Sequence, residues 1–370
     1  MSPQKRNGRY IVRWRESGRQ RSRSFDRRRD AVDFEARVRS AKQRGEPVLA
    51  SSVTTLSELV AEWVPRKARN LEPRTAEWYG YLFDTHVEPY LGDRRLTDLR
   101  PGTLMDWQEA RLAEGAGATA IRRSAMLVSQ LLDYAMRREL IRDNPARVLE
   151  RPRQGSTREV RPLSPDEVEA VRADLLARDR LGDAVLVSVL AYTGLRPGEA
   201  LGLEWGHVRG RTVLVEQRNV GGELVPTTKT KRARPVTLLG PVTADLAEWK
   251  LAMRPHRARR GPDLVFPRPR GGPWNLPTDL NNWRRRAWRD ALENAGLPYG
   301  RPYDLRHSYA SLLIHSGLSI VEVAAQLGHS PVMTMRTYGH VFAEAPERGV
   351  DAADLIRLAR EKRTEQEEAL

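Results

Sequence analysis

Apolar and polar positions alternate with a period of two near the start of the chain. Tyr10, Val12 and Trp14 fall on one face of an expected strand, and a second short strand ends near Phe25. Apolar residues then recur every three or four positions, which is typical of a helix. The pattern predicts a small sheet backed by one helix in residues 1–50, and the alternative is a basic tail without structure.

A helical period of apolar residues dominates the next stretch, residues 54–150. Thr55 and Glu58 have the spacing of a capping box, and the apolar stripe that follows them indicates a first helix. Clusters that contain proline or glycine interrupt the pattern further along. More helices are expected at about 73–85, 101–114 and 117–141, with breaks at 86–92 and 143–145.

The remainder of the chain mixes both periods. Ser164 and Glu167 form a second expected capping box, and an apolar helix covers 183–192. Helical patterns resume near residue 241 and continue to the end. Short strands are expected between these parts, at 212–217, 224–228 and 234–239, with a turn at Gly221-Gly222. The expected fold class is mainly α with small antiparallel β-sheets (α+β).

The charge of the chain limits the classes of molecule that it is expected to bind. A net charge of +15 and a pI near 10.4 favour a polyanion, with DNA or RNA ahead of a membrane surface. Residues 1–50 hold 15 Lys and Arg against 6 Asp and Glu, a net of +9, whereas residues 344–370 hold 5 against 8. The polar start has no apolar signal segment, and no apolar run approaches the length of a bilayer span. We therefore expect a cytoplasmic protein that does not enter a membrane.

The chain has no cysteine. Disulfides, thiolate metal clusters and a thiol nucleophile are therefore excluded. No group of residues resembles a metal cage. If a tyrosine takes over the phosphate, the phosphotyrosine keeps the energy of the original bond, so we expect a reaction that needs neither a metal ion nor another cofactor. The candidate chemistry lies instead in short motifs built from arginine, lysine, histidine and tyrosine.

These motifs follow one another in the second half of the chain. They supply guanidiniums, an ammonium, an imidazole and a phenol, which together suit the attack of a tyrosine on a phosphodiester. In chain order they are Thr193-Gly194-Leu195-Arg196-Pro197-Gly198-Glu199, Thr228-Lys229-Thr230, Asp304-Leu305-Arg306-His307, Leu327-Gly328-His329 and Thr337-Tyr338-Gly339-His340.

With these motifs the chain resembles the tyrosine recombinase, or phage integrase, family from about residue 54 to 342. The first fifty residues carry a weaker resemblance to the arm-binding domain of integrases. The resemblance implies a site-specific enzyme that cuts and rejoins duplex DNA through a 3′-phosphotyrosine, and that integrates and excises a mobile element. The domains it implies are an arm-type DNA-binding domain (1–50), a helical, SAM-like core-binding domain (54–150), a catalytic domain (160–343) and a C-terminal tail (344–370). The tail would dock on a neighbouring subunit or fold back on its own chain.

The chemistry of phosphoryl transfer suggests a role for the strongest candidates. Arg196 and Arg306 can clamp the charge that builds up on the phosphate oxygens, because guanidiniums stay charged and bind oxygens in pairs. Tyr338 stands nine residues after His329, the spacing that the family shows for its nucleophile. By the same resemblance, Lys229 is the general acid that protonates the leaving 5′-oxygen, with Lys231 as the alternative.

The remaining candidates support these groups. His329 would donate a hydrogen bond to the scissile phosphate, and Glu199 would orient Arg196 or a neighbour. His307 and His340 are expected behind the reacting groups. Basic residues beside Lys229, among them Arg232 and Arg234, are expected to touch DNA phosphates.

One position departs from the family pattern, which usually reads His-Asp-Leu-Arg-His. Tyr303 stands where the first histidine is expected. A tyrosine can still donate a hydrogen bond to the phosphate, but it is a poorer proton acceptor near neutral pH. The family's expected base for Tyr338 is therefore in doubt at this position.

The resemblance also implies partners and rival functions. The partners are double-stranded DNA at core and arm sites, a homotetramer on that DNA, a host DNA-bending protein and an excision factor. One rival function is a type IB topoisomerase-like enzyme, which relaxes DNA without exchanging partners. The other is a DNA-binding relative without catalytic activity.

Overall fold

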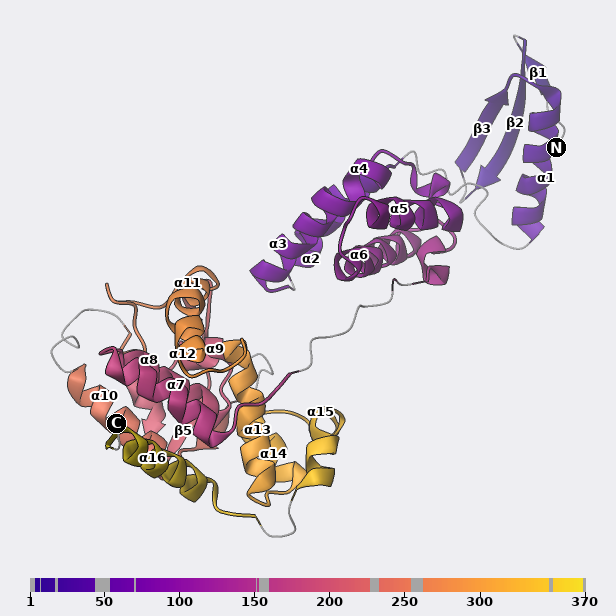
Figure 1. Ribbon diagram of the computed structural model, residues 1–370. Coiled ribbons are helices and arrows are strands. Elements are labelled where there is room, and N and C mark those ends of the chain that lie inside the picture. Colours follow the sequence, from indigo (N-terminus) through magenta and orange to yellow (C-terminus); the bar gives the residue numbers. More distant parts are fainter. Residues whose placement is uncertain are drawn as a thin grey trace. The chain divides into compact units, whose positions relative to one another are not determined.

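The computed structural model describes two compact units, Met1–Thr157 and Arg158–Leu370 (Figure 1). The residues described are 4–6, 8–16, 19–43, 54–69, 71–150, 152, 160–226, 233–253, 262–345 and 349–368.

The first unit begins with an antiparallel sheet and one helix. The sheet has the order β1 (Gln4–Arg6), β2 (Arg9–Glu16) and β3 (Arg19–Phe25), and α1 (Arg28–Gln43) follows it. Val12 and Trp14 of β2 are buried together with apolar residues of α1, and the Trp14 and Phe34 rings meet edge to face. The sheet and helix predicted for this part are confirmed, because the alternating face of β2 has a helix to pack against.

A helical module makes up the rest of the first unit. The predicted capping box starts α2: the Thr55 hydroxyl accepts from the Glu58 amide at 3.2 Å, and the Thr55 amide donates to the Glu58 carboxylate at 2.9 Å. The apolar faces of the helices form one core. The elements are α2 (Leu56–Ala68), α3 (Pro73–Leu82), the π-helical turn η1 (Phe83–Val87), α4 (Glu88–Leu91), α5 (Pro101–Ala113) and α6 (Ala118–Arg137).

The predicted break at 86–92 is wrong. Helical turns continue through η1 to the end of α4 at Leu91. Pro89 is tolerated there because it lies in the first turn of α4, where a missing amide hydrogen costs little.

The second unit is mainly helical. Its central helix, α8 (Leu181–Thr193), is buried on almost every side because α7, α10 and α13 pack around it. This explains why the sequence of α8 is apolar without a polar face. The other helices are α7 (Pro165–Ala177), α9 (Pro197–Ala200), α10 (Gly240–Ala252), α11 (Thr278–Trp283), α12 (Arg289–Asn294), α13 (Leu305–His315), α14 (Ile320–Leu327), α15 (Pro331–Glu344) and α16 (Ala352–Glu368).

The strands of this unit form two separate antiparallel sheets, and β4 (Val208–Arg209) and β6 (Arg218–Val220) were not among the three predicted strands. β4, β5 (Thr212–Val215) and β8 (Arg234–Thr237) form one antiparallel sheet. β6 and β7 (Glu223–Val225) form a separate hairpin, whose turn uses positive φ angles of 63° and 97° at Gly221 and Gly222. The predicted strand 212–217 therefore ends early, and β8 rather than β7 pairs with it.

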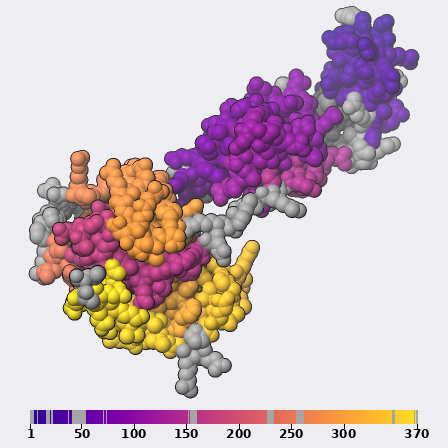
Figure 2. Space-filling model, in the orientation of Figure 1, coloured from indigo at the N-terminus to yellow at the C-terminus, as the bar shows by residue number. Residues whose placement is uncertain are grey.

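The last helix, α16, packs against α7 and α10 of its own chain. Ala352, Ile356 and Ala359 are its buried apolar residues. Its atoms lie on the surface of the unit, as the yellow group in Figure 2 shows. The chain thus has the predicted fold class, mainly helical with small antiparallel sheets. None of the helices in the described ranges is long and apolar enough to cross a bilayer.

Candidate active site

A buried carboxylate joins two arginines from distant segments. Arg196 precedes α9, and its Nη1 donates to Glu199 Oε1 at 2.9 Å. Arg234, the first residue of β8, donates from Nη2 to Glu199 Oε2 at 2.7 Å. Burial by itself would raise the pKa of Glu199, but the hydrogen bond and charge of Arg234 and the charge of Arg196 lower it to about 2. Glu199 therefore stays ionised and holds both guanidiniums in place.

Arg234, which was expected to touch DNA phosphates, lies inside the cluster and not on the surface. Its side chain is buried, and Nε also donates to the Gln326 backbone oxygen at 3.2 Å. Alternation along β8 places Arg234 on the same inward face as Val236. That period of two is the signal in the sequence that distinguishes Arg234 from the basic residues before it.

A glycine makes room for the Arg234 side chain. Gly328 ends α14 with a φ of 64°, and a Cβ at this position would lie 2.9 Å from Arg234 Cδ. The glycine therefore serves both the left-handed helix end and the close approach of the arginine.

Arg306, on α13, is a buried cation held by neutral groups. Its side chain donates to the backbone oxygens of Gly194 and Leu327, and Nη2 lies 2.9 Å from His329 Nε2. Among the described residues it forms no ion pair with a carboxylate, and its Nε is buried without a hydrogen-bond partner. Burial and the nearby charge of Arg196 lower the pKa of Arg306 to about 10, so it remains charged at neutral pH.

His329 is the neighbour of Arg306 and is neutral. Burial and the positive charges of Arg306 and Arg196 lower the pKa of His329 to about 4. Because a guanidinium can only donate, Nε2 accepts from Arg306 and the ring proton is on Nδ1. His329 Nδ1 is buried without a partner in the described part of the chain. It is therefore a donor that is ready for a ligand.

Tyr338, on α15, lies near this cluster with its side chain 3% exposed. Its hydroxyl is 3.1 Å from His307 Nδ1, and the two ring centroids are 5.5 Å apart. Burial raises the pKa of Tyr338 to about 12, although the charge of Arg306 acts in the opposite direction. The phenol is consequently protonated at neutral pH.

Tyr303 lies at the rim of the site. Its side chain is 43% exposed, and its ring centroid lies 6.1 Å from that of His307 in an edge-on contact. Lys229, together with Lys231 and Arg232, lies outside the described residues.

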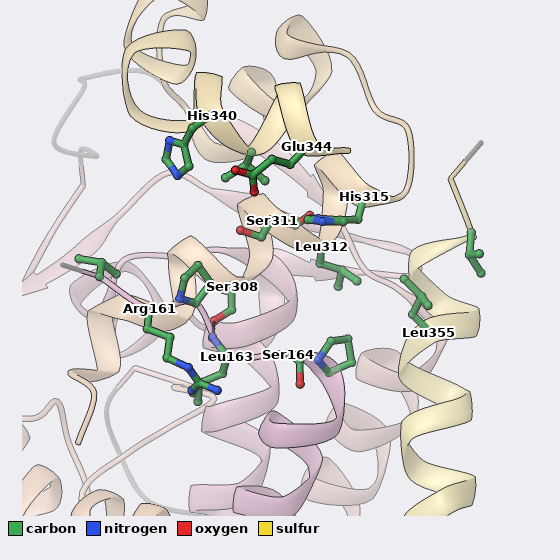
Figure 3. A pocket seen from close by; sticks show the side chains of 15 residues that line it. Arg161, Leu163, Ser164, Ser308, Ser311, Leu312, His315, His340, Glu344 and Leu355 are labelled. Atoms are coloured by element: carbon green, nitrogen blue, oxygen red, sulfur yellow. Dashed lines mark hydrogen bonds between the residues drawn. The ribbon is translucent and has the colours of Figure 1, made fainter. Parts of the chain in front are cut away.

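His340 faces a different space from the other candidates. It lines a cavity of about 960 Å³ between α13, α15 and the segment before α7. Figure 3 shows its ring at the cavity wall, across from Ser311 and Ser308 of α13, where the Ser308 hydroxyl accepts from the Leu163 amide at 2.8 Å. The described residues contain no cluster of three or more histidines or carboxylates that would suit a metal ion.

The assembled side chains suit a phosphate group. The cluster contains three guanidiniums, of which two bind Glu199, and only this one carboxylate. It therefore carries excess positive charge. Arg306 Nε and His329 Nδ1 are unpartnered donors, and the Tyr338 hydroxyl is close enough for the Arg306 charge to act on it. Such a site can bind a tetrahedral anion and stabilise added negative charge on its oxygens.

Most of the chain matches known protein families. Residues 161–345 match the phage integrase family, and residues 55–110 match the phage integrase N-terminal SAM-like domain. The integrase of Mycobacterium phage L5 is 27% identical over 303 residues, which cover 78% of this chain and 76% of that protein. Tyrosine recombinase XerC of Mesorhizobium japonicum is 28% identical over 305 residues, which cover 79% and 90%.

Solved structures share the fold. The Tn1549 transposon integrase in complex with transposon right end DNA has a TM-score of 0.67 at 18% identity, covering 77% of this chain and 95% of that one. A lambda integrase tetramer bound to a Holliday junction has a TM-score of 0.62 at 17% identity, covering 93% and 94%. At these identities the likeness shows the fold alone.

Proposed function

Because this chain belongs to the phage integrase family, we propose that it cuts and rejoins duplex DNA through a covalent bond between Tyr338 and a 3′-phosphate. Its activity is site-specific recombination. We further propose which residues perform each step, and which DNA sites and partners the enzyme uses.

The observation that carries the residue assignment is the pair of buried, unpartnered donors, Arg306 Nε and His329 Nδ1. Burying such groups without a hydrogen bond is unfavourable, so a site that keeps them is adapted to a ligand that accepts hydrogen bonds. A phosphodiester supplies anionic oxygens that accept from both. Arg196 is held by Glu199 at 2.9 Å and adds a third donor group.

The proposed reaction has two transesterification steps. The Tyr338 oxygen attacks the phosphorus, a phosphotyrosine bond forms, and the bond from phosphorus to the 5′-oxygen breaks. Arg196, Arg306 and His329 stabilise the charge on the non-bridging oxygens. Lys229 donates a proton to the leaving oxygen. A 5′-hydroxyl of the partner strand then attacks the phosphotyrosine and releases Tyr338.

Tyr303 takes a supporting part in this proposal. Tyr303 is 43% exposed, and its hydroxyl would donate a hydrogen bond to a phosphate oxygen at the rim of the site. Glu199 positions Arg196 and Arg234 without touching the substrate. His340 lies outside the reacting cluster and supports it without contacting the phosphate.

The proposed substrates are core and arm sites on duplex DNA, bound by a homotetramer. Residues 1–50 bind arm sites, 54–150 bind core DNA and 160–343 carry catalysis, and α16 of the tail packs on its own chain. Relatives named integrase, from Mycobacterium phage L5 and from ICEBs1 of Bacillus subtilis, support a role in moving a mobile element. A host DNA-bending protein and an excision factor complete the proposed partners.

The test is covalent trapping on nicked suicide duplexes made from the flanking genomic DNA. The wild-type chain should form an adduct that survives a denaturing gel, and Tyr338→Phe should form none because phenylalanine has no nucleophile. Tyr299→Phe, a matched loss of a hydroxyl from a residue that is 43% exposed, should form the adduct like the wild type.

Other outcomes would change the proposal. An adduct with Tyr338→Phe would move the nucleophile elsewhere, with Tyr303 as the first candidate. Relaxation of supercoiled DNA without joining of two sites would favour a topoisomerase-like enzyme. Tight, salt-sensitive DNA binding by a wild type that forms no adduct on its mapped site would favour a non-catalytic relative.

A further inference from the structure

We propose that His307 is the catalytic base that takes the proton from the Tyr338 hydroxyl during attack on the phosphodiester. This inference rests on the proposed function and deepens it. Because Tyr303 stands where the family usually has a histidine, another group must accept the proton in this chain.

The geometry of the two side chains supports direct proton transfer. His307 Nδ1 is 3.1 Å from the Tyr338 hydroxyl, within the reach of a general base in the absence of substrate. Among the described residues, it is the hydrogen-bond partner of this hydroxyl. The pair joins the first turn of α13 to the middle of α15.

The charge states of the pair suit a transfer from Tyr338 to His307. Burial and the charge of Arg306 lower the pKa of His307 from its ordinary value, and Asp304 opposes them in part. The imidazole is therefore neutral at pH 7 and offers a lone pair. The phenol, with its pKa raised to about 12, keeps its proton until the bond to phosphorus begins to form. The transfer therefore accompanies the attack and does not precede it.

The other groups that face His307 are less suited to this task. Tyr303 packs edge-on against its ring, but a neutral phenol is a weak proton acceptor. His329 already accepts a hydrogen bond at Nε2 and carries its proton on Nδ1, so it has no lone pair to offer. Arg306 and Asp304 act on the imidazole through their charges.

The step is balanced in atoms and charge. The bond from the Tyr338 oxygen to its hydrogen breaks, the proton moves to His307 Nδ1, and the bond from that oxygen to phosphorus forms. The leaving 5′-oxygen takes a separate proton from the general acid. When a 5′-hydroxyl of the second strand attacks, its proton passes to the general acid, and the proton on His307 returns to the phenolic oxygen as Tyr338 leaves, so both groups are regenerated.

The experiment measures single-turnover adduct formation on the suicide duplex between pH 5 and pH 9, with DNA binding measured in parallel. His307→Gln keeps a polar side chain but has no basic nitrogen. Its rate at pH 7 should fall by about 100-fold or more, while its affinity for the duplex stays close to that of the wild type. His315→Gln, on the exposed side of the same helix, is the matched control and should cleave like the wild type.

The pH profile distinguishes a base from a merely structural residue. Because an imidazole must be neutral to accept a proton, the wild-type rate should fall on the acidic side of the ordinary histidine pKa of about 6.5, as the pH passes through the lowered pKa of His307. The His307→Gln profile should lack that acidic limb and rise steadily with pH. Added imidazole should restore part of the rate of His307→Ala.

Three results would overturn the assignment. These are a His307→Gln rate within threefold of the wild type, an unchanged acidic limb, and loss of DNA binding in both His307 variants, which would make the residue structural. Failure of the wild type to form any Tyr338 adduct would instead contradict the proposed function itself. The two failures are therefore distinguishable.

Discussion

Single residues in this site act mainly by fixing one another. Glu199 is 2% exposed and contacts guanidiniums from segments that lie on either side of the β6–β7 hairpin. Without its charge, Arg196 and Arg234 would repel each other in a buried space. The carboxylate therefore allows the site to keep a concentration of positive charge before any DNA is bound.

Gly328 gives a prediction at this scale. Gly328→Ala should move Arg234, because the new Cβ would meet Arg234 Cδ at 2.9 Å, and cleavage should fall by about tenfold or more. Gly296→Ala is the matched control: its φ is 67°, and nothing lies within 4 Å of the added Cβ.

Adduct formation measures the cleavage activity of both variants, and chemical denaturation measures their stability. Each variant should lose roughly 1–2 kcal/mol of stability, because alanine is strained in the left-handed region. Both variants should share this loss of stability, but only Gly328→Ala should also lose cleavage activity. Equal activities would mean that the approach of Arg234 does not matter for catalysis.

At the scale of elements, ion pairs anchor α16 to the catalytic unit. Arg360 of α16 contacts Glu169 of α7 at 3.1 Å and Asp245 of α10 at 2.7 Å. Arg172 of α7 binds the same two carboxylates, and the Tyr192 hydroxyl donates to Glu169 at 2.7 Å. The carboxylates are buried, so their charges must be balanced inside the unit by these two guanidiniums.

Arg360→Ala should therefore destabilise the second unit by about 2–3 kcal/mol, since Arg172 remains to balance only part of the buried charge. Arg357→Ala removes an exposed partner of Asp354 on the same helix and should change stability by less than about 0.5 kcal/mol. Thermal and denaturant unfolding of the full chain test the difference. Equal stabilities would show that α16 is held by its apolar face alone.

At the scale of the whole molecule, the two ends of the chain have opposite charge. The first fifty residues carry a net charge of +9, and exposed arginines such as Arg13 lie on the sheet of this part. Each phosphate that a protein binds releases counterions, so the number of bound phosphates sets the salt dependence of DNA binding.

We therefore predict that a chain beginning at residue 54 binds DNA with a shallower dependence on salt. The difference in the logarithmic slope should be about 0.9 for each phosphate that residues 1–50 bind in the full chain. It should occur on a long duplex with flanking sequence and vanish on a short duplex that carries the core site only. Titrations of both proteins over a range of salt concentrations measure it, and equal slopes on the long duplex would contradict a DNA-binding role for residues 1–50.

Much of the local structure follows from the sequence alone. The capping boxes at Thr55 and Ser164 start helices at the predicted positions, because a cap depends on residues three positions apart. The helix at 183–192 and the basic sheet at the start also follow from periodicity. The predicted break at 86–92 is wrong because a π-helical turn absorbs a residue and lets the next turn begin before Pro89.

The mainly helical class and the candidates Arg196, Arg306, His329 and Tyr338 follow from the sequence alone, because motifs and periods are local properties of a chain. Only the tertiary structure decided that Arg234 joins Glu199 inside the site. It also decided that His307 meets the Tyr338 hydroxyl, and that α16 packs on its own chain. These interactions join residues that are far apart in the sequence, so they depend on how whole elements pack and not on any spacing that the sequence displays.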